Sequence, residues 1–211
     1  DILHRDTGTI IPPRPRRKQL PIILSEEEVW KLIDSCKNLK HRTLLLGVYS
    51  AGLRVSEVVS LQPVHIERDR MMIRIEQGKG RKDRYTILSQ RFLTALGIYW
   101  REYRPEKYFF FGSDKAKPMA IGTAQQIYYK AKKKAGITRG RGIHTLRHCF
   151  ATHLMEQGVP IYVIKRMMGH VALSTTAGYM HVSKEFISTI KSPLDILTEE
   201  MKQPNDAKRI Q

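Results

Sequence analysis

The amino-acid sequence predicts one α+β domain that is mainly helical and contains a small antiparallel sheet of three strands. The 211 residues are close to the size of a single domain. Apolar residues recur at helical spacing over most of the chain, whereas short β-like stretches are confined to residues 64–88. Hydrophobic residues make up 41% and charged residues 27% of the chain, which excludes a wholly disordered, collagen-like or disulfide-scaffold protein.

A basic, proline-rich segment precedes the globular domain. Within residues 1–24 the run IPPRPRRKQLP mixes four prolines with four basic side chains, and prolines at this density disfavour both helices and central strands. We therefore expect an extended linker, which acts either as a solvated tether or as a cationic strap beside a polyanion. The domain, residues 25–183, then opens with a capping box in which Ser25 and Glu28 start a helix.

Two further helices precede the predicted sheet. A helix through residues 41–51 is interrupted by Gly52, and a short helix over residues 55–61 ends before Pro63, with Arg54 at the junction. The next stretches are short and β-rich, and a glycine-punctuated turn separates the last two. The expected strands are residues 65–69, 71–76 and 84–88, with the turn at residues 77–83.

The rest of the domain is expected to be helical around one buried connection, the aromatic segment at residues 108–112. Pro160 is expected to start the helix at residues 161–168, and Gly169 is expected to end it. The expected helices cover residues 89–103, 122–135, 144–157 and 161–168. A short amphipathic helix at residues 184–198 and a polar tail at residues 199–211 are expected to follow.

Net charge indicates the class of partner. The chain carries 37 Lys and Arg residues against 20 Asp and Glu residues, which gives a formal net charge of +17. Such an excess of positive charge is typical of proteins that bind polyanions. Nucleic acid is therefore the partner that the composition favours most.

Cysteine usage and hydropathy favour an intracellular protein. Cys36 and Cys149 are the only cysteines, so the sequence predicts neither a disulfide framework nor a cysteine zinc site, and it favours a reducing compartment. No run reaches ~18 consecutive apolar residues, and the first residues lack a secretory-signal pattern. We expect a soluble, cytoplasmic protein with no membrane partner. Because the chain begins at Asp1 rather than Met, we also expect a processed or excised piece of a longer protein.

Two arginines and a histidine at predicted helix starts form a candidate phosphate site. His144 and Arg147 stand three residues apart in the motif HTLR, so both project to one side near the positive end of the helix dipole. Arg54 is delivered by another helix start. Guanidinium groups are planar, permanently charged donors that can neutralise the oxygens of a five-coordinate phosphorus in place of metal ions. The pattern therefore predicts phosphate binding without a metal ligand set.

Three further residues can supply the chemistry of phosphoryl transfer. Lys79 lies between Gly78 and Gly80 in the predicted turn, where a flexible loop can bring an ammonium to the DNA backbone and protonate a leaving oxygen. His170 follows a helix end and can bind a phosphate oxygen or orient a neighbour. Tyr179 comes nine residues later, and a tyrosine can attack phosphorus to form a phosphotyrosine, which allows later rejoining without ATP.

Four motifs together resemble the catalytic domain of the tyrosine recombinase (phage integrase) family. They are AGLRVSE at 51–57, GKGRKD at 78–83, HTLRHCFATHL at 144–154 and MGHVALSTTAGYMHV at 168–182. Their order and spacing match as well, and the resemblance covers about residues 20–192. It implies the helical catalytic-core fold of that family and six site residues. By this resemblance Arg54 and Arg147 bind the phosphate, Lys79 is the general acid, His144 and His170 assist proton transfer and phosphate binding, and Tyr179 is the nucleophile.

The resemblance also implies a reaction and its partners. Attack of Tyr179 on the scissile phosphate leaves a 3′-phosphotyrosine and a free 5′-hydroxyl, and a 5′-hydroxyl of the partner duplex then attacks that linkage. No metal or other cofactor is implied. The implied partner is double-stranded DNA that carries a specific recombination site, bound by a tetramer, with a monomer as the state without DNA. Family members usually carry an N-terminal helical domain that completes a clamp around DNA, whereas only the basic linker precedes the catalytic part here.

Basic residues outside these six are candidates for further DNA contacts, with a merely solvated face as the alternative. They are Arg81, Lys82, Lys130, Lys132, Lys133, Lys134, Arg139 and Arg141. Glu57 is expected to orient an arginine or to cap a helix. The aromatic side chains expected in the core rather than stacked on bases are Trp100, Phe109, Phe110, Phe111, Tyr128 and Tyr129. Residues 184–198 are expected either to dock on a neighbouring protomer or to fold back on their own domain.

Three other functions stay open at the level of sequence. A type IB topoisomerase shares much of the chemistry but cuts without site preference and rejoins the same strand. A telomere-resolving enzyme makes hairpin products. A catalytically silent DNA-binding remnant of a mobile element would be expected to lack one of the six residues, and all six are present.

Overall fold

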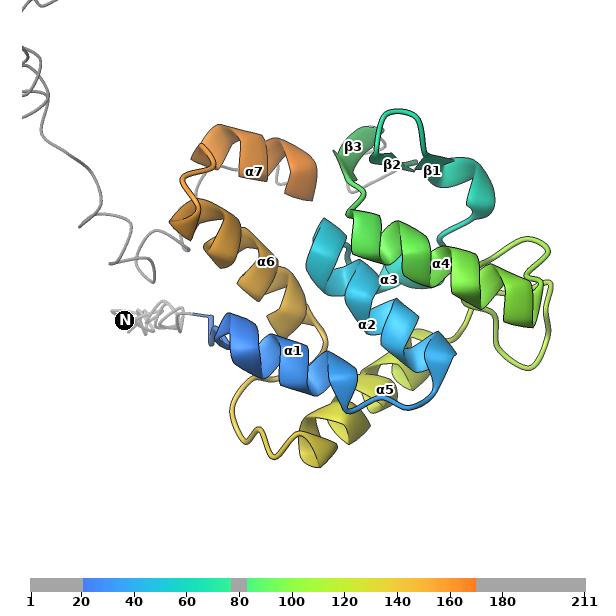
Figure 1. Cartoon of the computed structure of the whole chain (residues 1–211), viewed down its shortest axis with the longest axis horizontal. Coiled ribbons are helices and arrows are strands. Elements are labelled where there is room, and N and C mark those ends of the chain that lie inside the picture. Colours follow the sequence, from blue (N-terminus) through green and yellow to red (C-terminus); the bar gives the residue numbers. More distant parts are fainter. Residues whose placement is uncertain (1–20, 77–82, 170–211) are drawn as a thin grey trace, which may run out of the picture.

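A helical domain with one small sheet at its side makes up the computed structural model, which describes residues 21–76 and 83–169 (Figure 1). The predicted fold class, mainly helical α+β with a three-stranded antiparallel sheet, is confirmed. The elements in chain order are α1 (Glu26–Asp34), α2 (Leu39–Ala51), α3 (Val55–Val59), the 3-10 turn η1 (Pro63–His65), β1 (Ile66–Glu67), β2 (Met72–Ile75), β3 (Arg84–Ile87), α4 (Gln90–Tyr103), α5 (Ile121–Lys134), α6 (His144–Glu156) and α7 (Ile161–Met168).

The start of the folded region is anchored from Leu24 onward. Its side chain is fully buried, its backbone N–H donates to the sulfur of Cys149 over 3.3 Å, and its carbonyl lies 3.0 Å from Nε2 of His153. The predicted capping box follows, with both hydrogen bonds between Ser25 and Glu28 present. These contacts hold the start of α1 against α6, the helix that carries the candidate site residues His144 and Arg147.

Helix α2 is the centre of the packing, because α1, α3, α4, α5, α6 and β3 all lie against it. Its buried positions include Leu44, Leu45 and Val48. The helix ends at Gly52, whose φ of 60° lies in the left-handed region. Phe150 of α6 packs directly over that glycine, so the turn and the close approach both need a residue without a Cβ.

The sheet has the order β1-β2-β3, and both strand pairs are antiparallel. β3 pairs with β2 so that Arg84 stands opposite Ile75. Burial alternates along β3 and turns Arg84 and Thr86 toward the domain. Thr86 donates its hydroxyl to the carbonyl of Ala51 over 2.8 Å, which fastens the sheet to the end of α2. The strand β1 is shorter than the expected residues 65–69, because His65 belongs to η1 and residues 68–69 form a turn.

The predicted aromatic core is confirmed except at one position. Phe109, Phe110, Phe111 and Tyr128 are buried, and Trp100 packs against the core while partly exposed. The expectation for Tyr129 is wrong, because half of its surface, 50%, is exposed. Along α5 the buried positions are 124, 127, 128 and 131, so residue 129 falls on the solvent side of the helical period.

Replacing Gly52 by alanine is expected to destabilise the fold by about 2 kcal/mol or more, because the new Cβ would meet the Phe150 ring in a left-handed backbone conformation. The free energy of unfolding in urea measures this effect. Gly97→Ala is the matched control, since nothing lies within 4 Å of its Cβ position inside α4. That change is expected to stabilise the protein by roughly 0.5–1 kcal/mol. Equal effects of the two variants would contradict this account of Gly52.

Candidate active site

The carboxylate of Glu57, in the first turn of α3, is the centre of a cluster of arginines. Arg54 is the N-cap of that short helix, and its backbone N–H donates to Oε2 of Glu57 over 2.7 Å. The guanidinium of the same arginine donates from Nη1 to Oε1, also over 2.7 Å. Because the two residues are three positions apart at a helix start, the Glu57 side chain reaches both the backbone and the side chain of Arg54, as in a capping box. The expectation that Glu57 orients an arginine agrees with this geometry.

A second arginine, Arg84 of β3, grips the same carboxylate. Its Nη1 donates to Oε1 of Glu57 over 2.9 Å, and its Nη2 donates to Oε2 over 2.7 Å. The pair is a two-pronged guanidinium–carboxylate contact, the strongest geometry that these groups offer. Arg84 is not among the site residues that the sequence predicts. The only available signal was its phase on the strand, since it shares a face with the buried Thr86.

Arg147 of α6 approaches from a third direction and is almost fully buried, with 6% of its side chain exposed. Its Nη1 lies 3.8 Å from Oε2 of Glu57. The same nitrogen donates to the carbonyl of Gly52, at the end of α2. Arg54, Arg84 and Arg147, from three separate parts of the sequence, thus surround one carboxylate.

The carboxyl end of α7 lies against all three arginines. Arg84 donates to the carbonyl of Met167 over 2.8 Å, Arg147 to that of Met168, and Arg54 to that of Gly169 over 2.9 Å. These carbonyls have no partner within the helix, and they carry its negative partial charge. The contacts fix the point from which the chain continues to His170. In Figure 1, α7 and the sheet lie together at the top of the domain, and the end of α2 points toward them.

The charge of the cluster suits an anion. Burial by itself raises the pKa of Glu57, but the hydrogen bonds and charge of Arg84, the backbone N–H of Arg54 and the charge of Arg147 outweigh it and lower the pKa to about 2. Glu57 is therefore ionised at neutral pH. One negative charge faces three guanidiniums, which leaves the cluster positive.

His144 lies beside this cluster at the first position of α6. Burial, together with the charges of Arg147 and Arg54, lowers its pKa from the usual 6.5. The imidazole is consequently neutral at pH 7 and can accept a proton. One turn further along α6, burial and the neighbouring charges of His144 and Arg147 lower the pKa of His148 to about 4.

The structure therefore brings together three of the six predicted catalytic residues, namely Arg54, His144 and Arg147. Lys79, His170 and Tyr179 lie outside the described residues, as do Arg81 and Lys82 and the segments 184–198 and 199–211. Two of the places where the described chain adjoins an undescribed segment lie at the cluster: Arg84 closely follows residues 77–82, and Gly169 directly precedes residue 170.

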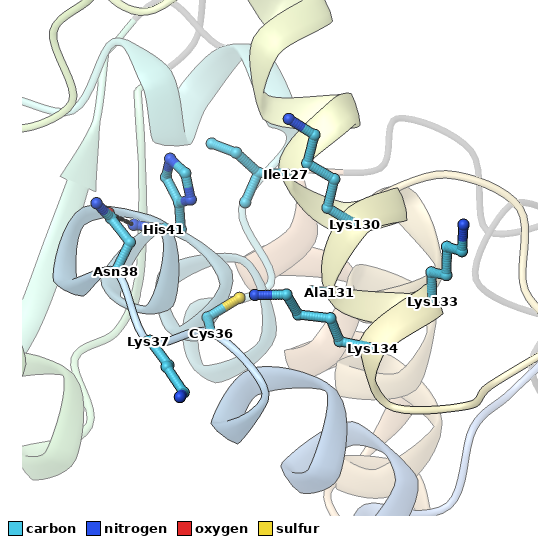
Figure 2. Close-up of a pocket in the computed structure, with 9 residues that line it drawn as sticks. All are labelled: Cys36, Lys37, Asn38, His41, Ile127, Lys130, Ala131, Lys133 and Lys134. Carbon is cyan, nitrogen blue, oxygen red and sulfur yellow. Dashed lines mark hydrogen bonds between the residues drawn. The ribbon is translucent and has the colours of Figure 1, made fainter.

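The lysines of α5 form a different site. A cavity of about 670 Å³ lies between the connection from α1 to α2 and the carboxyl half of α5 (Figure 2). Four of its lining residues are lysines, namely Lys37, Lys130, Lys133 and Lys134, and no carboxylate lines it. In Figure 1, α5 lies at the bottom of the domain, away from α7 and β3. This cavity is therefore separate from the arginine cluster.

Of the other predicted basic residues that the structure describes, two have protein partners and one is exposed. Lys132 donates to the carbonyl of Gly140 over 2.8 Å. Arg139 pairs with Glu28, which lowers the pKa of that carboxyl group. Arg141 is exposed just ahead of α6.

Neither a metal-binding cluster nor a membrane-spanning helix is present within residues 21–76 and 83–169. No group of three or more His, Cys, Asp or Glu side chains in these ranges is placed to hold a metal ion. None of the helices described there has the length and apolar character needed to cross a bilayer. Cys36 and Cys149 are both buried, free thiols.

Comparison with known proteins decides the family. The family model described as "Phage integrase family" matches residues 23–185. The chain belongs to the phage integrase family. It is 39% identical over 208 residues to the Sinorhizobium fredii protein y4qK, whose name is that of an integrase/recombinase, and the match covers 98% of this chain and 68% of that protein. It is 34% identical over 176 residues to the tyrosine recombinase XerA of Pyrococcus horikoshii, with 81% of this chain and 60% of that protein covered.

Solved structures of recombinases share the fold. The crystal structure of XerA recombinase matches with a TM-score of 0.72 at 27% identity, over 86% of this chain and 66% of that one. The XerH site-specific recombinase bound to a palindromic difH substrate matches with a TM-score of 0.72 at 23% identity, over 81% of this chain and 52% of that one. The predictions of a tyrosine recombinase catalytic domain, and of a site-specific recombinase enzyme that acts on DNA, are confirmed.

Acid is expected to weaken the integrase fold through Glu57. Because the pKa is lowered from its usual 4.5 to about 2, the carboxylate contributes stability above pH 4.5 that is lost as the pH falls toward 2. The difference corresponds to about 3 kcal/mol. Glu57→Gln should therefore unfold at lower urea than the wild type at pH 7, and the difference should shrink at pH 3. The exposed Glu106→Gln is the control, and an equally pH-independent loss for both variants would contradict the assignment.

Proposed function

We propose that this chain is the catalytic part of a recombinase that cuts DNA at a specific site through a 3′-phosphotyrosine on Tyr179. The observation that carries the proposal is the set of guanidiniums around Glu57, which joins the start of α6 to the end of α7. A scissile phosphate there would meet the positive charge of Arg54 and Arg147. The match of the whole described region to tyrosine recombinases supports the same assignment.

In the cleavage step, the phenolic oxygen of Tyr179 forms a bond to phosphorus while the bond from phosphorus to the 5′-oxygen breaks. The proton of the phenol passes to a base, and the neutral His144 is suited to that role. Lys79 gives a proton to the departing 5′-oxygen, which leaves as a hydroxyl. Arg54 and Arg147 stabilise the added negative charge on the phosphoryl oxygens in the transition state, and His170 binds or orients the same group.

The second step reverses the first with a different nucleophile. A 5′-hydroxyl attacks the phosphotyrosine, the phosphodiester is restored and Tyr179 recovers its proton. The phosphodiester energy is stored in the tyrosine linkage, so no ATP is consumed. Arginine and histidine side chains supply the charge stabilisation, so the proposal includes no metal or other cofactor.

Double-stranded DNA with a recombination site is the proposed substrate, and XerH provides a structural neighbour that is bound to such a substrate. We extend the proposal to a tetramer on DNA, a monomer without DNA and a cytoplasmic location with the DNA. Residues 1–24 serve as a basic linker to the catalytic domain at residues 25–183. Residues 184–198 form a helix that docks on a neighbouring protomer, ahead of a polar tail at residues 199–211.

The lysine-lined cavity of Figure 2 is the proposed second contact with DNA. Four lysines line it, and no carboxylate is among the residues that line it. Lys130 and Lys134 also act on His41, whose pKa is lowered by burial and by the charges of Lys40 and these two lysines. A phosphate of the DNA backbone would reduce the mutual repulsion of these positive charges. Contacts of this type add affinity without sequence preference.

Covalent trapping tests the proposed nucleophile. Wild-type protein and Tyr179→Phe are mixed with a pool of nicked DNA duplexes in EDTA, resolved under denaturing conditions, and any attached DNA is sequenced. We expect an adduct from the wild type only, with DNA binding nearly unchanged in the variant, because the phenyl ring lacks the attacking oxygen. Equal trapping by Tyr179→Phe would contradict the assignment. Attachment without sequence preference would favour a topoisomerase, and binding without attachment would favour a silent remnant.

Salt dependence tests the lysine cavity. The triple variant Lys130→Gln, Lys133→Gln, Lys134→Gln should flatten the plot of log affinity against log salt by about 0.9 for each phosphate contact removed. The control carries the same loss of charge at exposed lysines between α4 and α5, namely Lys107→Gln, Lys115→Gln, Lys117→Gln. The same slope for the two triple variants would rule out a specific contact at the cavity.

A further inference from the structure

Arg84 is almost fully enclosed although it carries a permanent charge. Only 8% of its side chain is exposed, compared with 22% for Arg54. The alternation of β3 turns it inward, on the same face as Thr86. A buried guanidinium needs hydrogen-bond acceptors, because an unpaired charge is costly to remove from water. Its partners therefore indicate what it does.

Those partners are the two elements that form the phosphate site. Both terminal nitrogens of Arg84 donate to Glu57, one to each carboxylate oxygen, and this fork fixes the plane of the carboxylate. The same two oxygens accept the Nη1 group and the backbone N–H of Arg54. The orientation that Arg84 imposes on Glu57 is thereby transmitted to the guanidinium of Arg54.

The third bond of Arg84 reaches the end of α7. Its Nε donates to the carbonyl of Met167, and the next carbonyl, that of Met168, accepts from Arg147. The fit is close, since a Cβ at Gly169 would lie 2.8 Å from Cδ of Arg84. Gly169 also has a φ of +62°. The end of α7 therefore rests directly on the Arg84 side chain, at the point where the chain continues to His170.

We propose that Arg84 is a positioning residue for strand cleavage: through Glu57 and the end of α7 it sets Arg54 and Arg147 for the scissile phosphate without touching that phosphate. The inference rests on the proposed function. Arg84 is less exposed than Arg54, and the contacts described for its guanidinium are to Glu57 and Met167. Arg84 is the first residue of β3, the strand that follows the predicted Lys79 turn. It therefore connects this strand to Arg54 and Arg147.

The test is the rate of covalent attachment to a nicked duplex at saturating DNA, measured beside the dissociation constant for the same duplex. In Arg84→Lys the charge is kept but a point-charge ammonium cannot donate a planar fork to both oxygens of Glu57. We expect attachment to slow at least tenfold, while the dissociation constant changes less than twofold. An unchanged rate of attachment would overturn the proposal.

A control on the same face of β3 separates positioning from stability. Thr86→Val removes the hydroxyl that donates to Ala51 and should lower the melting temperature without disturbing Glu57. We expect its rate of attachment to stay within twofold of the wild type below its melting temperature. A loss of rate in Thr86→Val as large as in Arg84→Lys, at a similar drop in melting temperature, would show that Arg84 matters only for stability.

A double-mutant comparison tests whether Arg84 acts through Glu57. If it does, the double variant Arg84→Lys, Glu57→Gln should attach to DNA no more than about twofold more slowly than the slower of the two single variants. A double variant whose loss of attachment rate equals the product of the two single losses would overturn the proposal. Absence of any adduct from the wild type would instead overturn the proposed function, and the inference with it, whereas an adduct formed equally well by Arg84→Lys would overturn the inference alone.

Discussion

The structure depends on one buried carboxylate. Glu57 is 10% exposed, and the cost of removing its charge from water is offset by the hydrogen bonds and charges of the arginines around it. Those arginines come from the start of α3, from β3 and from α6, so a single side chain holds segments separated by more than ninety residues of chain. Without the carboxylate, three guanidiniums would face one another at close range. With it, they keep a net positive charge while their directions are fixed, which is the condition for binding an anion in a defined pose.

Helix ends complete what the carboxylate begins. The carbonyls at the end of α7 accept from the same three arginines, and the start of α6 places His144 and Arg147 near its positive end. Opposite helix ends thus meet at the site, one to hold the guanidiniums and one to favour a phosphate. Arg54 is the more exposed of the two arginines proposed to bind the phosphate, at 22% against 6% for Arg147.

Local signals in the sequence were sufficient for much of the fold and for part of the site. Features that depend only on neighbouring residues are all present in the structure. They are the capping box at Ser25, the helix ends at Gly52 and Gly169, and the helix starts that carry Arg54 and Arg147. Arg84 was missed because its burial depends on α7, more than eighty residues away. Arg139 pairs with Glu28 across 111 residues, which no local pattern can reveal. Tyr129 was misplaced because an aromatic residue was assumed to be buried, whereas the helical period of α5 turns it outward.

The central claim is that the guanidiniums held by Glu57 act by neutralising the scissile phosphate. The most direct measurement compares covalent attachment to a nicked duplex that carries either a phosphate or an uncharged methylphosphonate at the scissile position. With phosphate, Arg54→Ala should attach at least a hundredfold more slowly than the wild type, because one charge opposite the phosphoryl oxygens is lost. With methylphosphonate most of that difference should disappear, since there is less charge to neutralise. An equal loss on both duplexes would contradict the claim and would assign Arg54 a structural role.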